Sequence, residues 1–285
     1  MAINKPIYKF KNFINENREK INYKNLSLNP NAISYLKKNP RLIVWDYLSE
    51  NTNQEVIDLL LDNRDKIKWF YVVQNPNLYE LIRFMPEDDM KYYYDLLSSN
   101  PKAISDMIKN NYDKINWDKL SLNPHPDAVK LLLENQHKIN WILLSKNSNT
   151  DVVNFLIENP NKIHFNAFSL NENPIAISYL DKNQYKINWD NLSSNSSAFS
   201  ILVKNKDRIN WDFASKNHRI FELTSNLDIL NWYYLSENPA IFELDYENMQ
   251  KNNYEFYEDL IKEIMKPSRV FKERDYDYLE VLFGD

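Results

Sequence analysis

Residues Ile115–Pro124 read Ile-Asn-Trp-Asp-Lys-Leu-Ser-Leu-Asn-Pro, and variants of this stretch recur along most of the chain. Aligning the aromatic residue gives ten copies at intervals of 21 to 25 residues. The aromatic positions are Tyr23, Trp45, Trp69, Tyr94, Trp117, Trp141, Phe165, Trp189, Trp211 and Trp232. A fixed period in this range is typical of a repeat protein whose units stack on one another.

Two polar positions repeat together with the aromatic residue. An asparagine lies six residues after it in every copy: Asn29, Asn51, Asn75, Asn100, Asn123, Asn147, Asn171, Asn195, Asn217 and Asn238. A serine lies four residues after it in nine copies, and Val73 is the exception. Asparagine caps helix starts and proline suits the first helical position, so Asn29-Pro30 and Asn123-Pro124 predict helix starts. We expect these asparagines to satisfy backbone groups at a turn, and a polar ligand-binding face is the alternative.

Each repeat is predicted to contain two short helices. The first begins at an Asn cap such as Asn22 or Asn116, and the aromatic residue and the Leu three residues later face inward. The second has about nine to eleven residues, with apolar residues at helical spacing. It is expected to end in a left-handed cap at Asn39, Asn63, Asn110, Asn135, Asn159, Asn183 and Asn205. Such short helices are marginal alone, so the seven tryptophans are expected to form a core shared between repeats.

These features predict an all-α fold, an α-solenoid of about ten two-helix repeats of ~23 residues each. At the usual helix spacing the stack would be a curved rod on the order of 90 Å long. Residues 1–17 are interpreted as an N-terminal cap, 18–245 as tandem repeats and 246–285 as a C-terminal helical cap. The cap is expected to contain longer helices over about 249–265 and 269–283, separated by Pro267.

Composition excludes several classes of function. The 285 residues include one glycine and no cysteine, which argues against phosphate-binding loops, disulfides and cysteine–zinc sites. The four histidines show no metal-ligand spacing, and the net charge of −5 disfavours direct nucleic-acid contact. No stretch approaches the ~20 apolar residues of a membrane helix. We therefore expect no enzymatic activity, no cofactor or metal, and no membrane partner.

Some aromatic residues exceed what a core requires. The irregular repeat that contains Val73 carries Phe70, Tyr71, Tyr92 and Tyr93, and the last repeat carries Tyr233 and Tyr234. Exposed aromatic residues anchor protein interfaces, so we interpret these six as candidate protein-contact residues, together with Arg269 and Lys272 of a basic cluster. Local repair of a degenerate repeat is the competing interpretation of the aromatics, and a solvated helix face that of the basic cluster.

The repeat motif also suggests a family. Ile-Asn-Trp-Asp-x-Leu-Ser-x-Asn-Pro, followed by a short Leu-rich helix and Asn-x-x-Lys, resembles repeats in uncharacterised proteins of giant DNA viruses of the mimivirus-like group. Residues 264–271, Ile-Met-Lys-Pro-Ser-Arg-Val-Phe, are similar to the His-Pro-Ser-Arg motif near the end of those proteins, with Lys266 in place of His. The resemblance covers about residues 18–275 and implies expression in a host cytoplasm, at or near a viral factory.

Together these features favour a non-enzymatic scaffold or adaptor that binds other proteins in the cytoplasm. Two alternatives remain open at this stage. One is a structural component of a virion or assembly, and the other is a scaffold in a viral translation or nucleic-acid complex.

Overall fold

The computed structural model describes residues 6–264, which fall into two compact units. The larger unit is Phe10–Phe242, and the smaller one contains residues 6–9 and 243–264 of the described chain. The larger unit is built from repeated pairs of short helices, which confirms the predicted all-α repeat fold. We number its repeats 1 to 10 by their aromatic residue, from Tyr23 to Trp232.

The first helix of each repeat begins at or near the aromatic residue. These helices are α2 (Tyr23–Leu28), α4 (Trp45–Leu48), α6 (Trp69–Val72), α9 (Trp117–Ser121), α11 (Trp141–Lys146), α13 (Phe165–Phe168), α15 (Trp189–Ser194), α17 (Trp211–Ala214) and α19 (Trp232–Leu235). Repeat 4 instead has α7 (Glu87–Tyr93) followed by the 3-10 helix η6 (Tyr94–Ser99). The predicted Asn caps accept backbone N–H groups at six of these starts, as Asn116 does from Lys119 at 3.0 Å.

The second helices are α3 (Ile33–Lys38), α5 (Val56–Leu61), η5 (Pro76–Phe84), α8 (Ile104–Asn110), α10 (Pro126–Glu134), α12 (Thr150–Glu158), α14 (Pro174–Lys182), α16 (Phe199–Lys204) and α18 (Ile220–Leu223). Short 3-10 turns also occur at this point of three repeats. The turn η2 (Pro30–Ala32) precedes α3, η11 (Ser196–Ala198) precedes α16, and η14 (Pro239–Ile241) follows α19. Asn29 caps such a turn with Pro30 at its first position, as predicted. Asn123-Pro124 does not start a helix, because α10 begins two residues later, at His125-Pro126.

The predicted left-handed caps at the ends of the second helices are wrong. Asn159, for example, has φ −122° and ψ 64°, and the chain passes directly into a further 3-10 turn. Its side chain instead donates to the carbonyl of Phe155, four residues earlier, at 2.8 Å. The turns that follow are η3 (Pro40–Leu42), η4 (Arg64–Lys66), η7 (Tyr112–Lys114), η8 (Gln136–Lys138), η9 (Pro160–Lys162), η10 (Gln184–Lys186), η12 (Lys206–Arg208) and η13 (Leu227–Ile229).

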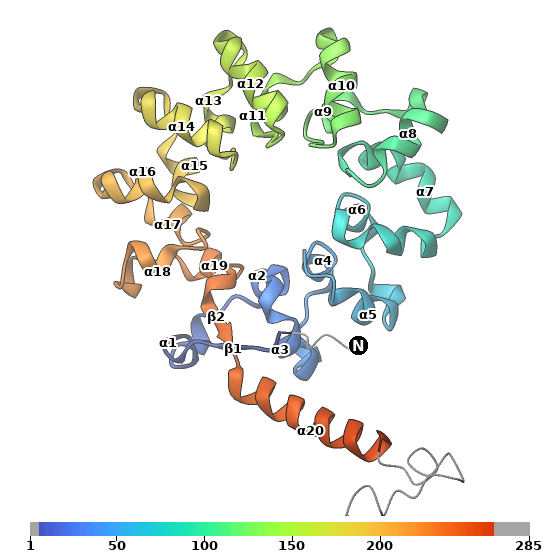
Figure 1. The fold of residues 1–285 in the computed structure, drawn as a ribbon, viewed down its shortest axis with the longest axis vertical. Helices are drawn as coiled ribbons and strands as arrows, with labels where there is room; N and C mark the ends of the chain where they lie inside the picture. Colours follow the sequence, from blue (N-terminus) through green and yellow to red (C-terminus); the bar gives the residue numbers. More distant parts are fainter. Residues whose placement is uncertain (1–5, 265–285) are drawn as a thin grey trace, which may run out of the picture. The chain divides into compact units, whose positions relative to one another are not determined.

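The larger unit closes on itself, so the expected open rod is wrong. The amide nitrogen of Asn29 in repeat 1 donates to the carbonyls of Ser236 and Asn238 in repeat 10, at 3.1 and 2.8 Å. The backbone N–H of Asn22 donates to the Ser236 hydroxyl at 2.9 Å. Figure 1 shows the resulting circle, with the first helices on its inner side and the second helices outside, except that α7 of repeat 4 lies on the outer side. Each repeat is rotated from the last by about one tenth of a turn, and these rotations sum to a full circle.

Repeat 10 is completed by the N-terminal segment. Between α19 and the end of the larger unit the only helical segment is η14, and the missing second helix is α1 (Asn12–Asn15), which is followed by η1 (Arg18–Lys20). Phe13 of α1 packs edge-on against Phe221 of α18, with ring centroids 5.0 Å apart. Lys20 lies over the Trp232 ring at 5.3 Å. Residues 10–17 therefore belong to the repeat unit, and the proposed N-terminal cap over 1–17 needs this correction.

The described residues also include a small two-stranded sheet. Strands β1 (Tyr8–Phe10) and β2 (Phe242–Leu244) pair with each other. They run antiparallel, since Lys11 N–H donates to Ile241 and Asp245 N–H donates to Ile7. In the smaller unit, α20 (Tyr246–Ile264) corresponds to the helix expected over about 249–265. The second expected cap helix, with Arg269 and Lys272, lies outside the described residues.

The repeated asparagine connects every repeat to the previous one. Asn147 is representative: its amide nitrogen donates to the carbonyls of Ser121 and Asn123 at 3.1 and 2.9 Å. Its amide oxygen accepts the backbone N–H of Asn149 at 3.0 Å. All ten of these asparagines are buried and make both kinds of bond. Their burial excludes a ligand-binding role for them, and we call this set the asparagine ladder.

The tryptophans lie at the edge of the core, not in its interior. The residue three positions after the aromatic is buried instead, and Leu120 and Leu144 are fully buried. Trp45, Trp69, Trp117, Trp141, Trp189, Trp211 and Trp232 are all half-buried. A cation from the end of the same repeat covers several of them, and Lys138 lies 4.0 Å from the Trp117 ring centre. The core prediction is therefore corrected: the indole supports the core edge, where a lysine stem and a cation–π contact cover it.

None of the helices within residues 6–264 combines the length and the apolar character needed to cross a bilayer.

The asparagine ladder predicts a specific response to substitution. Asn147→Ala should lower the free energy of unfolding by several kcal/mol, because each buried backbone group left unpaired costs about 1–3 kcal/mol. Asn147→Asp should cost at least as much at neutral pH, since a carboxylate would face two carbonyl oxygens. That cost should shrink when the new carboxyl group is protonated. Urea unfolding at two pH values measures both effects, with the exposed Asn161→Asp as control.

The composite repeat predicts that the N-terminal segment contributes core energy. Ile14 is fully buried, so Ile14→Ala should cost about 2–5 kcal/mol. Ile201→Ala, in the continuous repeat 8, is the matched comparison because that side chain is also fully buried. Deletion of residues 1–20 should in addition raise the radius of gyration in solution scattering. An unfolding midpoint that responds to Ile201→Ala and not to Ile14→Ala would show that α1 is no part of the core.

Candidate protein-interaction surface

The exposed carboxylates of the first helices are used within the repeats. Asp118, Asp190 and Asp212 lie in the first turn of their helices and are exposed. Each accepts a hydrogen bond from the cap asparagine of the next repeat, at 3.0, 2.8 and 3.1 Å. No group of three or more metal-binding side chains occurs among residues 6–264. These acids therefore serve the contacts between repeats and do not gather into a cation site in the described part of the chain.

Side chains two and five residues after the repeated aromatic lie on the concave side of the circle. Lys119 and Gln74 occupy these positions in repeats 5 and 3, and their side chains meet at 3.5 Å across repeat 4. Lys216 and Glu237 occupy the fifth position in repeats 9 and 10 and form an ion pair at 2.9 Å. Side chains two repeats apart approach one another only on the inner side of a curved stack. These positions therefore line the concave surface of the larger unit.

The aromatic candidates from the sequence fall into two clusters. Phe70 packs edge-on against Tyr71 and Tyr93, with centroids 5.2 and 6.5 Å apart. Tyr233 packs edge-on against Tyr234 at 5.3 Å. Phe70 and Tyr233 occupy the same register position and are 46% and 47% exposed. Tyr92 is 68% exposed.

Closure of the circle brings these two clusters onto one arc. Repeats 9, 10, 1, 2 and 3 are consecutive around the circle, and their residues two after the aromatic are Phe213, Tyr234, Asn25, Tyr47 and Tyr71. Phe213 and Tyr234 stack across the junction of repeats 9 and 10, with centroids 6.1 Å apart. On repeats 5 to 8 the same positions carry Lys119, Leu143, Ala167 and Asn191. We call Phe213, Tyr234, Tyr47 and Tyr71, with the exposed Phe70 and Tyr233, the aromatic strip.

Sequence reasoning missed Tyr47 and Phe213. Both occupy the register position of Tyr71 and Tyr234, and this shared register was the signal that could have identified them. Local aromatic density in the sequence drew attention to the two clusters alone. Their place on one surface depends on the contact between repeats 10 and 1, which the repeat motif does not encode.

One carboxyl group on this arc, that of Glu50, has a raised pKa. Partial burial, and then the neighbouring Glu237 carboxylate, raise the pKa of Glu50 above its ordinary value. Glu50 lies at the fifth position of repeat 2, two repeats from Glu237. Glu237 has its own cation in Lys216, whereas Glu50 makes no ion pair within residues 6–264. The charged form of Glu50 is thus less favourable in the folded protein than in water.

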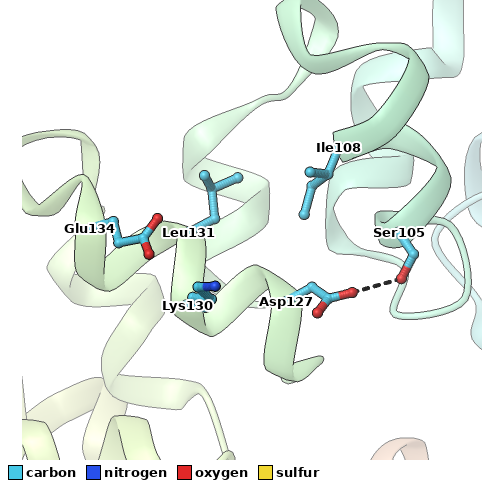
Figure 2. A pocket seen from close by; sticks show the side chains of 6 residues that line it. All are labelled: Ser105, Ile108, Asp127, Lys130, Leu131 and Glu134. Carbon is cyan, nitrogen blue, oxygen red and sulfur yellow. Dashed lines mark hydrogen bonds between the residues drawn. The ribbon is translucent and has the colours of Figure 1, made fainter.

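Two grooves open on the larger unit. One, of about 280 Å³, lies between repeats 2 and 3 and is lined by Glu50, Thr52, Tyr71, Gln74, Asn75 and Pro76. The other, of about 260 Å³, lies between α8 and α10 on the outer side. Figure 2 shows that Asp127 in this outer groove is directed at Ser105, with a hydrogen bond of 2.8 Å, and that Lys130 lies beside it. The outer groove therefore already contains an acidic and a basic side chain. The groove between repeats 2 and 3, which we call the inner groove, is lined by Glu50 and by Tyr71 of the aromatic strip.

Comparison of the chain with protein-family models, with characterised proteins and with solved structures gives no match. The interpretation of this surface therefore rests on its geometry and on the chemistry of its side chains.

The raised pKa of Glu50 predicts a pH-dependent penalty. The folded state binds the Glu50 proton more tightly than the unfolded state, so this residue disfavours folding as the pH rises through its folded pKa. Glu50→Gln should therefore raise the melting temperature at neutral pH, and the gain should vanish at a pH where the carboxyl is protonated. Lys216→Met should lower it, because Glu237 would lose its cation. Differential scanning fluorimetry across pH tests this, with the exposed Glu172→Gln as control. A Glu50→Gln protein less stable than wild type would contradict the assignment.

Proposed function

We propose that this protein is a non-enzymatic scaffold that binds other proteins through the aromatic strip. The observation that supports the proposal is the gathering of six aromatic side chains on one arc of a hydrogen-bonded circle. Large aromatic side chains bury about 150–250 Å² each in interfaces, and at roughly 25 cal/mol/Å² a few of them supply most of a binding energy. Exposed Phe70 and Tyr233 are the anchors in this proposal.

The circle itself favours binding. A surface held by inter-repeat hydrogen bonds is already ordered, so a partner loses little free energy in organising it. Closure also joins the two end repeats to each other, and an open solenoid would leave these ends for stacking with further copies. This favours the scaffold over a structural component of a virion built by end-to-end contacts. The acidic net charge of −5 argues against direct contact with nucleic acid.

The place of action follows from the resemblance of the repeat motif. We propose that the protein works in the cytoplasm of a host cell, as a viral protein of the giant-virus group would. Its partner is then a viral or host protein present in that compartment.

The test of this function is partner capture that depends on the strip. A double variant, Phe70→Ala with Tyr233→Ala, should lose the partners that the wild-type protein retains in quantitative cross-linking from expressing cells. Its melting temperature should stay within a few degrees of wild type, because both side chains are exposed. Tyr185→Ala is the matched control, since this tyrosine is 80% exposed outside the strip. Equal partner recovery by all three proteins would refute the proposed function.

A further inference from the structure

The walls of the inner groove are held by hydrogen bonds, whereas the Glu50 carboxylate in it has no partner among the described residues. Asn75 is held in the asparagine ladder by its bond to the Asn51 carbonyl at 2.9 Å. The Gln74 amide donates to the Phe70 carbonyl at 2.9 Å and accepts from Lys119 at 3.5 Å. Among the described residues, the Glu50 carboxylate has neither a hydrogen-bond donor nor a cation. The groove thus presents an unpaired anion between ordered polar walls.

The aromatic wall complements that anion. Tyr71 lines the groove with Glu50, and its contact with Phe70 at 5.2 Å holds it in place. A cation beside an aromatic face and a carboxylate gains from both, by about 0.5–2 kcal/mol from the ring alone. The chain already uses cation–π contacts within its repeats, with Lys66 4.6 Å from the Trp45 ring centre and Arg208 4.1 Å from that of Trp189. No cation of the chain performs this role at Tyr71 within residues 6–264.

The size of the groove selects the kind of occupant. At about 280 Å³, it lies below the roughly 300–1,000 Å³ of sites that enclose a small molecule. It is large enough for one long side chain that enters from the open side. Phe70 contacts the groove residue Tyr71, and Tyr47 has the register position of Tyr71 in repeat 2, so the aromatic strip offers contacts for the residues that flank the inserted side chain.

We propose that the groove between repeats 2 and 3 binds a lysine or arginine side chain from an extended basic segment of the partner protein. The cation pairs with Glu50 and lies against Tyr71, and the flanking residues of the segment contact the aromatic strip. The cation also relieves the unfavourable charge of Glu50 beside Glu237. This inference rests on the proposed scaffold function and names the chemistry of the partner.

The direct test uses a fluorescein-labelled hexalysine peptide and fluorescence anisotropy at low ionic strength. Glu50→Gln should weaken binding about tenfold, which equals about 1.4 kcal/mol. Tyr71→Leu, which retains bulk without a π face, should also weaken it, and the remote Glu172→Gln should not. Because Glu50→Gln is not expected to destabilise the fold, a loss of affinity cannot come from unfolding. Equal affinity of wild type and Glu50→Gln for the peptide would overturn the proposal.

Two further outcomes separate related explanations. Free lysine methyl ester should fail to displace the peptide at equal concentration, and displacement would show a site for small cations, which contradicts a partner segment. In the cross-linking experiment, Glu50→Gln should lose the same partners as the Phe70 and Tyr233 double variant. If only the double variant loses them, the groove inference fails and the scaffold function stands. If neither loses them, both fail.

Discussion

The asparagine amide of each repeat is the interaction on which the architecture depends. Its oxygen accepts a backbone N–H inside its own turn, and its nitrogen donates to carbonyls of the repeat before it, as Asn147 shows at 3.0, 3.1 and 2.9 Å. Serine is too short for this double role, aspartate has no donor, and glutamine has an additional methylene. This explains why the position is asparagine in all ten copies, whereas the aromatic residue varies among Trp, Tyr and Phe.

The repeated serine supplements the amide. Ser121 donates to the Trp117 carbonyl within its helix and accepts the backbone N–H of Asn140 from the next repeat, at 2.9 and 3.1 Å. Where the serine is replaced by Val73, the ladder still continues, because Asn100 donates to the Val73 carbonyl at 3.0 Å. The next repeat has the irregular pair α7 and η6, and repeat 3, which contains Val73, carries Phe70 and Tyr71 of the strip. Loss of one polar link and gain of contact surface coincide there.

Local features of the fold were predictable from the sequence. The period, the two helices and the Asn caps depend on residues close together in the chain, such as Asn116 and Lys119. Closure was not predictable in this way, because it depends on a small rotation summed over ten repeats. The half-buried position of Trp117 under Lys138 also arises from packing between helices. One sign of the composite repeat was present: Asn17, Lys20 and Ile21 match the end of a repeat whose beginning is absent from that part of the chain.

The two aromatic clusters of the candidate surface were predictable from the sequence, whereas their union on one arc was not. Phe70, Tyr71, Tyr233 and Tyr234 lie where aromatic density indicated, and two of them are strongly exposed. Their union with Tyr47 and Phe213 requires the circle, because repeats 9 and 3 lie far apart in sequence. The raised pKa of Glu50 arises first from its partial burial and then from Glu237, on the far side of the closure.

The composite repeat has a consequence for biosynthesis. Since proteins are made from the N-terminus, α1 leaves the ribosome before all ten repeats, whereas its neighbours α18 and α19 emerge only after repeats 1 to 8. The segment must stay unpaired through that interval, and repeats 9 to 3 form one arc only after it has docked. A nascent or prematurely terminated chain therefore lacks the assembled surface. Under the proposed function, partners would bind only when translation has passed the final repeat, so the fold would act as a checkpoint on the synthesis of all ten repeats.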